Sequence, residues 1–362
     1  MDHHARRARL RDRLAERDVD ALLVTHLPNV RYLTGFGGSY GLTVVAAGSD
    51  GDGAFVTDGR YDEASSRQVA GLRRWISTDG PERPLAEACR ALGVTRLGFE
   101  PSHVTVAMHG RLGEALGPEG VELVGVDGEV EHLRWTKDAD EMALLAAAQE
   151  AADVAFERVL EMLAEGRTER EVAFDLEAAM RVAGAEGPGF DSIVAFGENA
   201  AEPHHGPTGR PLGRGDVVKL DFGCSVGGYV CDTTRTVAFG EPPGSLREIH
   251  EVVRRAQQAG IDAVAVGVAG GEPDRAARAV IEEAGYGERF VHSLGHGVGL
   301  EVHEGPYLRR GGTDVLPEGA VVTFEPGIYV PGLGGVRIED MVEVTAAGAR
   351  PMPRTTRELI VL

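Results

Sequence analysis

The first 128 residues alternate short apolar runs with amphipathic segments. Strands are predicted at 21–27, 42–47, 54–57, 74–77, 97–99 and 121–126. Helices are predicted at 5–16, 61–70, 84–92 and 104–116. The glycine-rich segment PNVRYLTGFGG, which follows the first strand, is predicted to be a loop. This alternation of strands and helices is typical of an α/β domain.

From Glu129 onward the pattern changes to longer helices and paired strands. A long helical run ends near Gly166, and Thr168 with Glu171 forms a capping box for a helix predicted at 169–182. Two more helices are predicted at about 244–260 and 271–284, before a β-rich segment from 290 to the end. We therefore expect two domains, 1–128 and 129–362. A helix pair followed by paired strands occurs twice in the second domain, which suggests an internal duplication.

Two aspartates lie in a predicted hairpin. Asp221 ends one apolar run, a reversal follows at 225–228, and the next apolar run contains Asp232. A turn centred on Val226 and Gly227 would place Asp221 directly opposite Asp232. Directly opposed carboxylates destabilise a hairpin unless a cation lies between them, so the pair predicts a metal ion. The alternative is one turn aspartate and one solvated aspartate at a strand end.

Composition and charge narrow the possible partners. A net charge of −20 over 362 residues disfavours nucleic acids and anionic membranes, because basic surfaces recognise both. No apolar run is long enough to span a bilayer. Cys89, Cys224 and Cys231 lack metal-site spacing, and although the last two could meet in the hairpin, separate buried thiols are the simpler expectation. We expect a cytoplasmic protein.

Histidines and further acidic residues gather near the end of the chain. The glycine-rich segment FVHSLGHGVGLEVHEGP contains His292, His296 and His303. Glu325 and Glu339 follow within two apolar runs, where an unpaired carboxylate is costly to bury without a cation or a metal. Arg337 is the alternative partner for Glu339.

Four carboxylates and one imidazole form a candidate metal-ligand set. These residues, called below the five predicted ligands, are Asp221, Asp232, His296, Glu325 and Glu339. Mostly hard oxygen ligands suit manganese, cobalt or zinc. Four negative charges can hold two divalent ions, which lower the pKa of water and polarise a carbonyl or phosphoryl oxygen. The set therefore predicts a hydrolase.

The segments LDFG, CDTTRT, GHGVG, FEPGIY and RIED carry these residues, and their order resembles the pita-bread metallopeptidases. That family includes methionine aminopeptidase, aminopeptidase P, prolidase and creatinase. The resemblance covers Leu133 to the C-terminus, and NVRYLTGF resembles the creatinase-type N-terminal domain. It implies an α+β protein in which an α/β creatinase-type domain precedes a pita-bread catalytic domain. It also implies that the five predicted ligands hold two metal ions, with Asp221 and Glu339 bridging.

The same resemblance implies roles for residues around the metals. His204, 17 residues before Asp221, is the implied substrate-side histidine, with adjacent His205 as a less favoured alternative. His303 and Glu325 are also implied to be catalytic. Residues implied to bind substrate or support the site are His292, Tyr329 and Arg337. In the hydrolytic mechanism that these roles imply, Glu325 moves a proton. His204 or His303 donates a hydrogen bond to the developing oxyanion or to the leaving nitrogen.

Three function classes follow. The leading one is a metal-dependent Xaa-Pro dipeptidase that cleaves before proline in short peptides, with aminopeptidase P activity on longer peptides as the alternative. For this class we expect two divalent ions, manganese before cobalt or zinc, and a homodimer formed through the N-terminal domain. Arg309 or Arg310 is a candidate partner for the carboxylate of a dipeptide. The second class is a non-peptidase enzyme on the same scaffold, and the third is an inactive binding module, which the complete ligand set disfavours.

Overall fold

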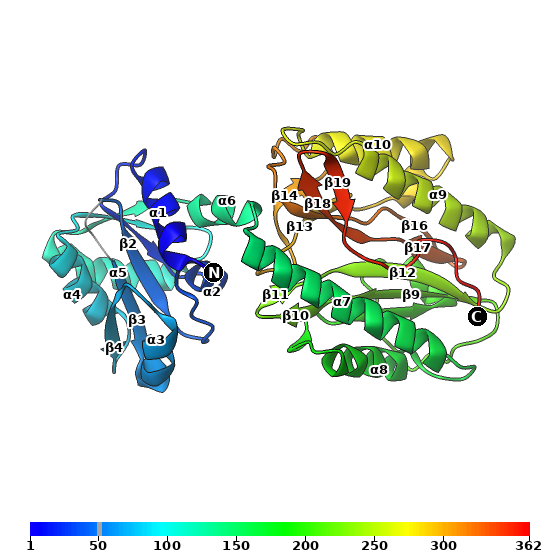
Figure 1. Cartoon of the computed structure of the whole chain (residues 1–362), viewed down its shortest axis with the longest axis horizontal. Coiled ribbons are helices and arrows are strands. Elements are labelled where there is room, and N and C mark those ends of the chain that lie inside the picture. The colour runs from blue at the N-terminus through cyan, green and yellow to red at the C-terminus, as the bar shows by residue number, and fades with distance from the viewer. Residues whose placement is uncertain (49–52) are drawn as a thin grey trace. The chain divides into compact units, whose positions relative to one another are not determined.

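The computed structural model describes residues 1–48 and 53–362, and it divides into two compact units, Met1–Arg134 and Trp135–Leu362 (Figure 1). The helix α6 (Glu129–Trp135) lies at this division. Its residues up to Arg134 belong to the first unit, whereas the sequence-based boundary at 128 places the whole helix in the second domain.

The N-terminal unit is built on a mixed six-stranded sheet in the order β4-β3-β2-β1-β5-β6. The strands are β1 (Ala21–Val24), β2 (Leu42–Ala46), β3 (Ala54–Asp58), β4 (Arg73–Ser77), β5 (Arg96–Phe99) and β6 (Glu122–Gly125). Its other helices are α1 (His3–Leu14), α2 (Leu27–Thr34), α3 (Asp62–Gln68), α4 (Glu82–Leu92) and α5 (Val106–Leu116). The predicted alternation of strands and helices is confirmed.

One N-terminal prediction was wrong. Most of PNVRYLTGFGG is helical, because α2 covers its first seven residues. Pro28 lies in the first turn of α2, where its missing N–H costs nothing, and Gly35 ends the helix with a φ of 79°. Gly35 therefore marks the end of a helix, and only the last four residues of the segment, 35–38, form the predicted loop.

The C-terminal unit begins with the helix pair α7 (Ala139–Met162) and α8 (Glu169–Val182). The predicted capping box of Thr168 and Glu171 is confirmed at the start of α8. A second capping box, formed by Asp138 and Glu141, starts α7 and separates it from α6, so the long helical run is two helices. The second helix pair is α9 (Gly244–Asp262) and α10 (Gly271–Glu283).

Antiparallel sheets follow each helix pair in the sequence. After α8, strands β12-β9-β8 form one sheet and β11-β10-β7 another; after α10, strands β14-β13-β15-β18-β19 form a larger sheet beside the β16-β17 hairpin. The first group is β7 (Gly187–Pro188), β8 (Ile193–Phe196), β9 (Asp216–Phe222), β10 (Cys224–Val226), β11 (Tyr229–Val230) and β12 (Thr233–Phe239). The second is β13 (Gly295–Gly297), β14 (Glu304–Leu308), β15 (Val321–Phe324), β16 (Gly327–Val330), β17 (Gly334–Arg337), β18 (Asp340–Thr345) and β19 (Gly348–Pro351).

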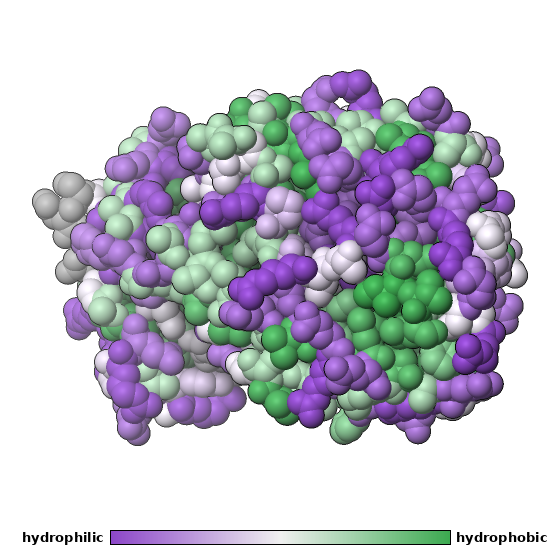
Figure 2. Space-filling model, turned by 45° about the vertical axis from the view of Figure 1, so that its right-hand side comes forward, coloured by the Kyte–Doolittle hydropathy of each residue, from purple (hydrophilic) through white to green (hydrophobic). Residues whose placement is uncertain are grey.

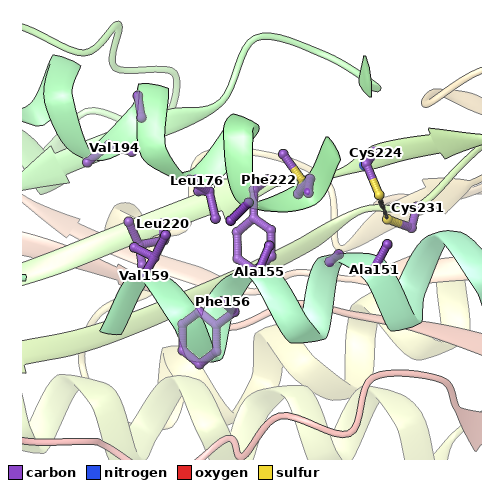
Figure 3. Packing of buried hydrophobic residues seen from close by; sticks show 14 of the residues in the cluster. Ala151, Ala155, Phe156, Val159, Leu176, Val194, Leu220, Phe222, Cys224 and Cys231 are labelled. Atoms are coloured by element: carbon purple, nitrogen blue, oxygen red, sulfur yellow. Dashed lines mark hydrogen bonds between the residues drawn. The ribbon is translucent and has the colours of Figure 1, made fainter. Parts of the chain in front are cut away.

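Strand β9 separates two hydrophobic cores. Val218, Leu220 and Phe222 pack with α7 and α8, and the rings of Phe222 and Phe156 stack with centroids 5.9 Å apart (Figure 3). Val217 belongs to the other core, with α9 and α10. Alternate residues of a strand point to opposite faces, so Lys219 and Asp221 share the face of Val217. Burial of each large apolar side chain contributes roughly 1.5–3 kcal/mol, which fixes the strand that carries Asp221.

The face shown in Figure 2 mixes hydrophilic and hydrophobic residues, with one broad strongly hydrophobic area on the right of the view. Within residues 1–48 and 53–362, no helix combines the length and hydropathy that a bilayer span requires. Cys224 and Cys231 do meet, with their sulfur atoms 3.8 Å apart as buried free thiols (Figure 3).

Candidate metal centre and its surroundings

The hairpin that carries the two aspartates has a different register from the predicted one. Strands β9 and β12 pair Asp221 with Thr234, so the predicted direct opposition of Asp221 and Asp232 was wrong. The turn is centred on Gly227 and Gly228, which have φ values of 56° and 76°. Both central residues of a type I′ turn need positive φ, and the Gly-Gly pair meets this need one residue later than expected. Asp232 lies diagonally across from Asp221, just before β12.

Four of the five predicted ligands converge in the interior of the C-terminal unit. Ligand atoms of Asp232, His296 and Glu339 lie within 4.8 Å of one another. Glu325 Oε1 lies 3.3 Å from His296 Nε2, and Asp232 Oδ2 lies 3.8 Å from the same nitrogen. These residues come from distant segments: His296 lies in β13, Glu325 directly after β15, and Glu339 between β17 and β18.

The fifth residue, Asp221, borders this cluster. Its Oδ2 atom accepts a hydrogen bond from Arg337 Nη2. Its Oδ1 atom is buried and has no hydrogen-bond partner among the described residues. A buried carboxylate oxygen without a partner is costly, and a coordinated cation would satisfy it.

The electrostatics of the cluster favour a bound cation. Burial and the neighbouring charge of Glu339 raise the pKa of Asp232 well above its ordinary value. Burial and the charge of Glu325 raise the pKa of Glu339 in the same way. Burial also acts to raise the pKa of Glu325, but the hydrogen bond and charge of His296 lower it to about 2. Like charges that repel in a buried site fit divalent cations, and the donor set of carboxylates with one imidazole suits hard or borderline metals.

Arg337, Tyr329 and His292 form a hydrogen-bonded group beside Asp221. Arg337 Nη1 donates to the Tyr329 hydroxyl at 2.9 Å, and His292 Nε2 lies 2.9 Å from the same oxygen. Burial raises the pKa of Tyr329 to about 12, so the phenol stays protonated at neutral pH. Arg337 forms its ion pair with Asp221 and acts on Glu339 only as a nearby charge. The alternative in which Arg337 is the ion-pair partner of Glu339 is therefore wrong.

Two further histidines lie at the exposed side of the cluster. The His303 ring lies 4.3 Å from the His296 ring, in an edge-to-face arrangement. His204 is exposed, and its charge acts on both His292 and His303, which places it near them. Burial lowers the pKa of His303, with His296 adding to the effect. Exposed imidazoles at this position can donate hydrogen bonds to a molecule that binds next to the cluster.

His205, the alternative to His204, serves a different purpose. It is buried, and its Nε2 lies 2.9 Å from Glu169 Oε2 while its Nδ1 lies 3.1 Å from Glu202 Oε2. It therefore anchors its own loop. Arg309 and Arg310 also have other contacts, since Arg309 lies over the Tyr307 ring at 5.5 Å and Arg310 pairs with Glu282 at 3.3 Å.

Sequence reasoning missed Lys219, which lies two residues before Asp221. It is fully buried, and burial lowers its pKa to about 6, with the charge of Arg337 adding to the effect. A lysine inside the apolar run VVKLDF is as costly to bury as a glutamate in such a run. That argument, applied here only to the glutamates, would have singled it out.

A buried group of carboxylates with one imidazole, beside two exposed histidines, is typical of a metal-dependent hydrolase. The chain belongs to metallopeptidase family M24, whose sequence pattern matches residues 143–346. The Creatinase/Prolidase N-terminal domain matches residues 6–136. The expected combination of a creatinase-type domain with a pita-bread catalytic domain is thereby confirmed, as is the prediction of a metallopeptidase.

Several known proteins are similar along nearly the whole chain. A Xaa-Pro dipeptidase from Pyrococcus horikoshii is 37% identical over 344 residues, which cover 94% of this chain and 95% of that protein. The structure of a Xaa-Pro dipeptidase from Bacillus anthracis superposes with a TM-score of 0.95 at 39% identity, covering 100% of both chains. An X-Pro aminopeptidase from Thermotoga maritima superposes with a TM-score of 0.89 at 34% identity, covering 97% of this chain and 99% of that one.

Proposed function

We propose that this protein is a Xaa-Pro dipeptidase that uses two divalent metal ions to release an N-terminal residue from proline. The observation that carries the proposal is the convergence of Asp232, His296, Glu325 and Glu339, with the unpartnered Oδ1 of Asp221 beside them. The similar Xaa-Pro dipeptidases, which align along nearly the whole chain, support the choice of substrate.

The five predicted ligands would hold the metals, and manganese is our first choice because four of the five donors are carboxylates. When bound, two such ions lower the pKa of water and polarise the scissile carbonyl. Arg337 would hold Asp221 in position through its ion pair. Thr234 would orient Glu339, since its hydroxyl donates to Glu339 Oε2 at 2.7 Å.

The remaining residues would handle protons and the substrate. Glu325, 3.3 Å from His296 and ionised at neutral pH, would accept the proton of the attacking water and pass it to the leaving nitrogen. His204 and His303, exposed beside the cluster, would donate hydrogen bonds to the oxyanion or the substrate. His292, which is partly exposed, would form a wall against which the substrate packs, and the buried Tyr329 would hold it through their hydrogen bond.

The chemistry of proline explains why such a wall is useful. An imide bond has no N–H, so an enzyme cannot hold it through that donor. The pyrrolidine ring must instead be recognised by shape against aromatic and apolar surfaces. His292 is only partly buried, and its hydrogen bond to the buried Tyr329, which Arg337 also holds, would keep the imidazole ring fixed as such a surface.

A comparison of three peptides tests the proposal. Manganese-loaded protein should hydrolyse Ala-Pro faster than Ala-Pro-Ala, and Ala-Leu should be the poorest substrate. Ala-Leu as the best substrate would refute the proline preference. Turnover of none of the three would favour a non-peptidase reaction on the same scaffold.

Aminopeptidase P activity is the second candidate function. The similarity to an X-Pro aminopeptidase supports it, as does the absence of a contact between Arg309 or Arg310 and the metal cluster among the described residues. Without a contact from Arg309 or Arg310, the carboxylate of a free dipeptide contributes less to the free energy of binding. Preference for Ala-Pro-Ala over Ala-Pro would select this candidate.

We also propose a cytoplasmic location and a homodimer. The location rests on the sequence-based expectation that the three cysteines form no disulfide framework. The homodimer rests on the sequence-based expectation that the N-terminal domain serves association.

A further inference from the structure

Lys219 contacts the loop that carries His204. Its Nζ atom donates to the backbone carbonyls of Ala200 at 3.2 Å and Pro203 at 3.3 Å, and also to the carbonyl of Glu202. The same nitrogen lies 5.3 Å from the centroid of the Tyr329 ring. One side chain of β9 thus holds three carbonyls within the four residues that precede His204.

The loop is held from its other side by Glu169, the first residue of α8. Glu169 Oε1 accepts from the backbone N–H of Phe196 and from Asn199 Nδ2, both at 2.9 Å. Glu169 Oε2 lies 2.9 Å from His205 Nε2 and accepts from the backbone N–H of Thr208 at 2.8 Å. Glu169 therefore fixes both ends of the loop, while Lys219 fixes its middle.

His204 lies between these two anchors. Its neighbour His205 points inward to Glu169, while His204 itself is exposed and acts electrostatically on His292 and His303. The direction of the His204 side chain depends on the backbone at Glu202 and Pro203. Arg337 Nη1 also donates to the Pro203 carbonyl at 3.1 Å, so the carbonyls of Ala200 and Glu202 are the specific partners of Lys219.

We propose that Lys219 is a positioning residue, which holds the segment Ala200–Pro203 so that His204 faces the substrate. The proposal rests on the proposed function of His204, but the contact itself does not. An amine and an ammonium group both donate N–H hydrogen bonds, so the contact is available in either protonation state. An apolar side chain would fill the same space in this apolar run without the cost of burying an amine. The hydrogen bonds to the loop account for a lysine at this position.

Hydrogen exchange tests the contact independently of activity. In metal-loaded Lys219→Met, amides of residues 197–205 should exchange at least about 10-fold faster than in the wild type, because local opening becomes easier. The matched control is Val218→Ala, which weakens the same strand on its opposite face and should leave exchange in 197–205 unchanged. Unchanged exchange in Lys219→Met would overturn the proposal, whether or not the protein proves to be a peptidase.

A double-mutant cycle tests whether Lys219 acts through His204. Lys219→Met should keep its metals and lower kcat/KM for the best substrate by about 10-fold, within the roughly 10²- to 10³-fold cost of losing one transition-state donor. In a His204→Ala background the same change should have almost no further effect. Lys219→Gln keeps N–H donors and should restore part of the rate, and it replaces Lys219→Met in the cycle should that variant fail to fold. Equal fold-losses in both backgrounds, or no rescue by glutamine, would overturn the positioning role.

Discussion

Replacing Asp232 by asparagine should change the stability of the protein in opposite directions with and without metal. The ligand atoms of Asp232, His296 and Glu339 lie within 4.8 Å of one another and are buried. If Asp232 and Glu339 were both ionised, their charges at a separation of 4.8 Å would repel by about 3.5 kcal/mol at an effective dielectric constant of roughly 20. The raised pKa values of both carboxyls mean that proton uptake relieves part of this repulsion in the metal-free protein, so about 3.5 kcal/mol is an upper limit. Asp232→Asn removes this repulsion from the metal-free protein, and it removes a ligand from the metal-loaded protein.

The size of the effect is measurable by thermal unfolding. The catalytic unit spans Trp135–Leu362. Units of this size shift their Tm by about 2–4 °C per kcal/mol. The chelated variant should therefore unfold above the chelated wild type at pH 8, by up to about 7 to 14 °C. In manganese the order should reverse, because the variant loses most of the stabilisation that bound metal provides.

Asp340→Asn is the matched control. Asp340 is also buried, but it pairs with Arg235 at 2.7 Å and with Arg357. Its replacement leaves the buried Arg235 guanidinium with hydrogen bonds to backbone carbonyls but without its carboxylate, which should destabilise both the chelated and the loaded protein by about 3–5 kcal/mol. If Asp232→Asn behaved like Asp340→Asn, lowering Tm in both conditions, the repulsion argument for a cation site would be refuted.

Three further predictions concern catalysis, pH and assembly. His204→Ala should retain both metal ions by elemental analysis yet lose roughly 10²- to 10³-fold in kcat/KM, and loss of the metals would instead make His204 a ligand. Burial lowers the pKa of His250 from 6.5 to about 4, so stability should fall as pH drops through this window. Wild type should lose about 2 kcal/mol between pH 7 and 5 that His250→Gln keeps, and equal losses in urea titrations would contradict this. Light scattering should give twice the 38.4 kDa chain mass, whereas the chain mass itself would contradict the homodimer.

Regular elements were predictable because their signals are local. The capping box of Thr168 and Glu171 lies within four residues, and α8 begins where it indicated. The N-terminal strands follow apolar runs, and packing buries those of β1, β2, β3 and β5 in the core. The errors arose at glycines, because the same residue can end a helix, lie in a loop or form a turn. Gly35 ends a helix, and Gly227 with Gly228 forms the turn that shifts the hairpin register.

The supports of the site were harder to predict because they link distant segments. Residue types at Asp232, His296 and Glu339 already indicated a metal, and folding brings these residues together. By contrast, the contacts of Lys219 with the loop before His204 depend on backbone carbonyls, which every residue has and no sequence pattern marks. The carbonyls that Lys219 contacts can be identified only when the path of the loop is known.

Titration of metal-free protein with manganese, monitored by proline release from Ala-Pro, tests the central claim most directly. We expect no turnover in chelator, recovery as metal is added, and a plateau at two ions per chain. Full activity in protein from which elemental analysis finds no metal would contradict the account, as would a plateau at one ion per chain in the wild-type protein.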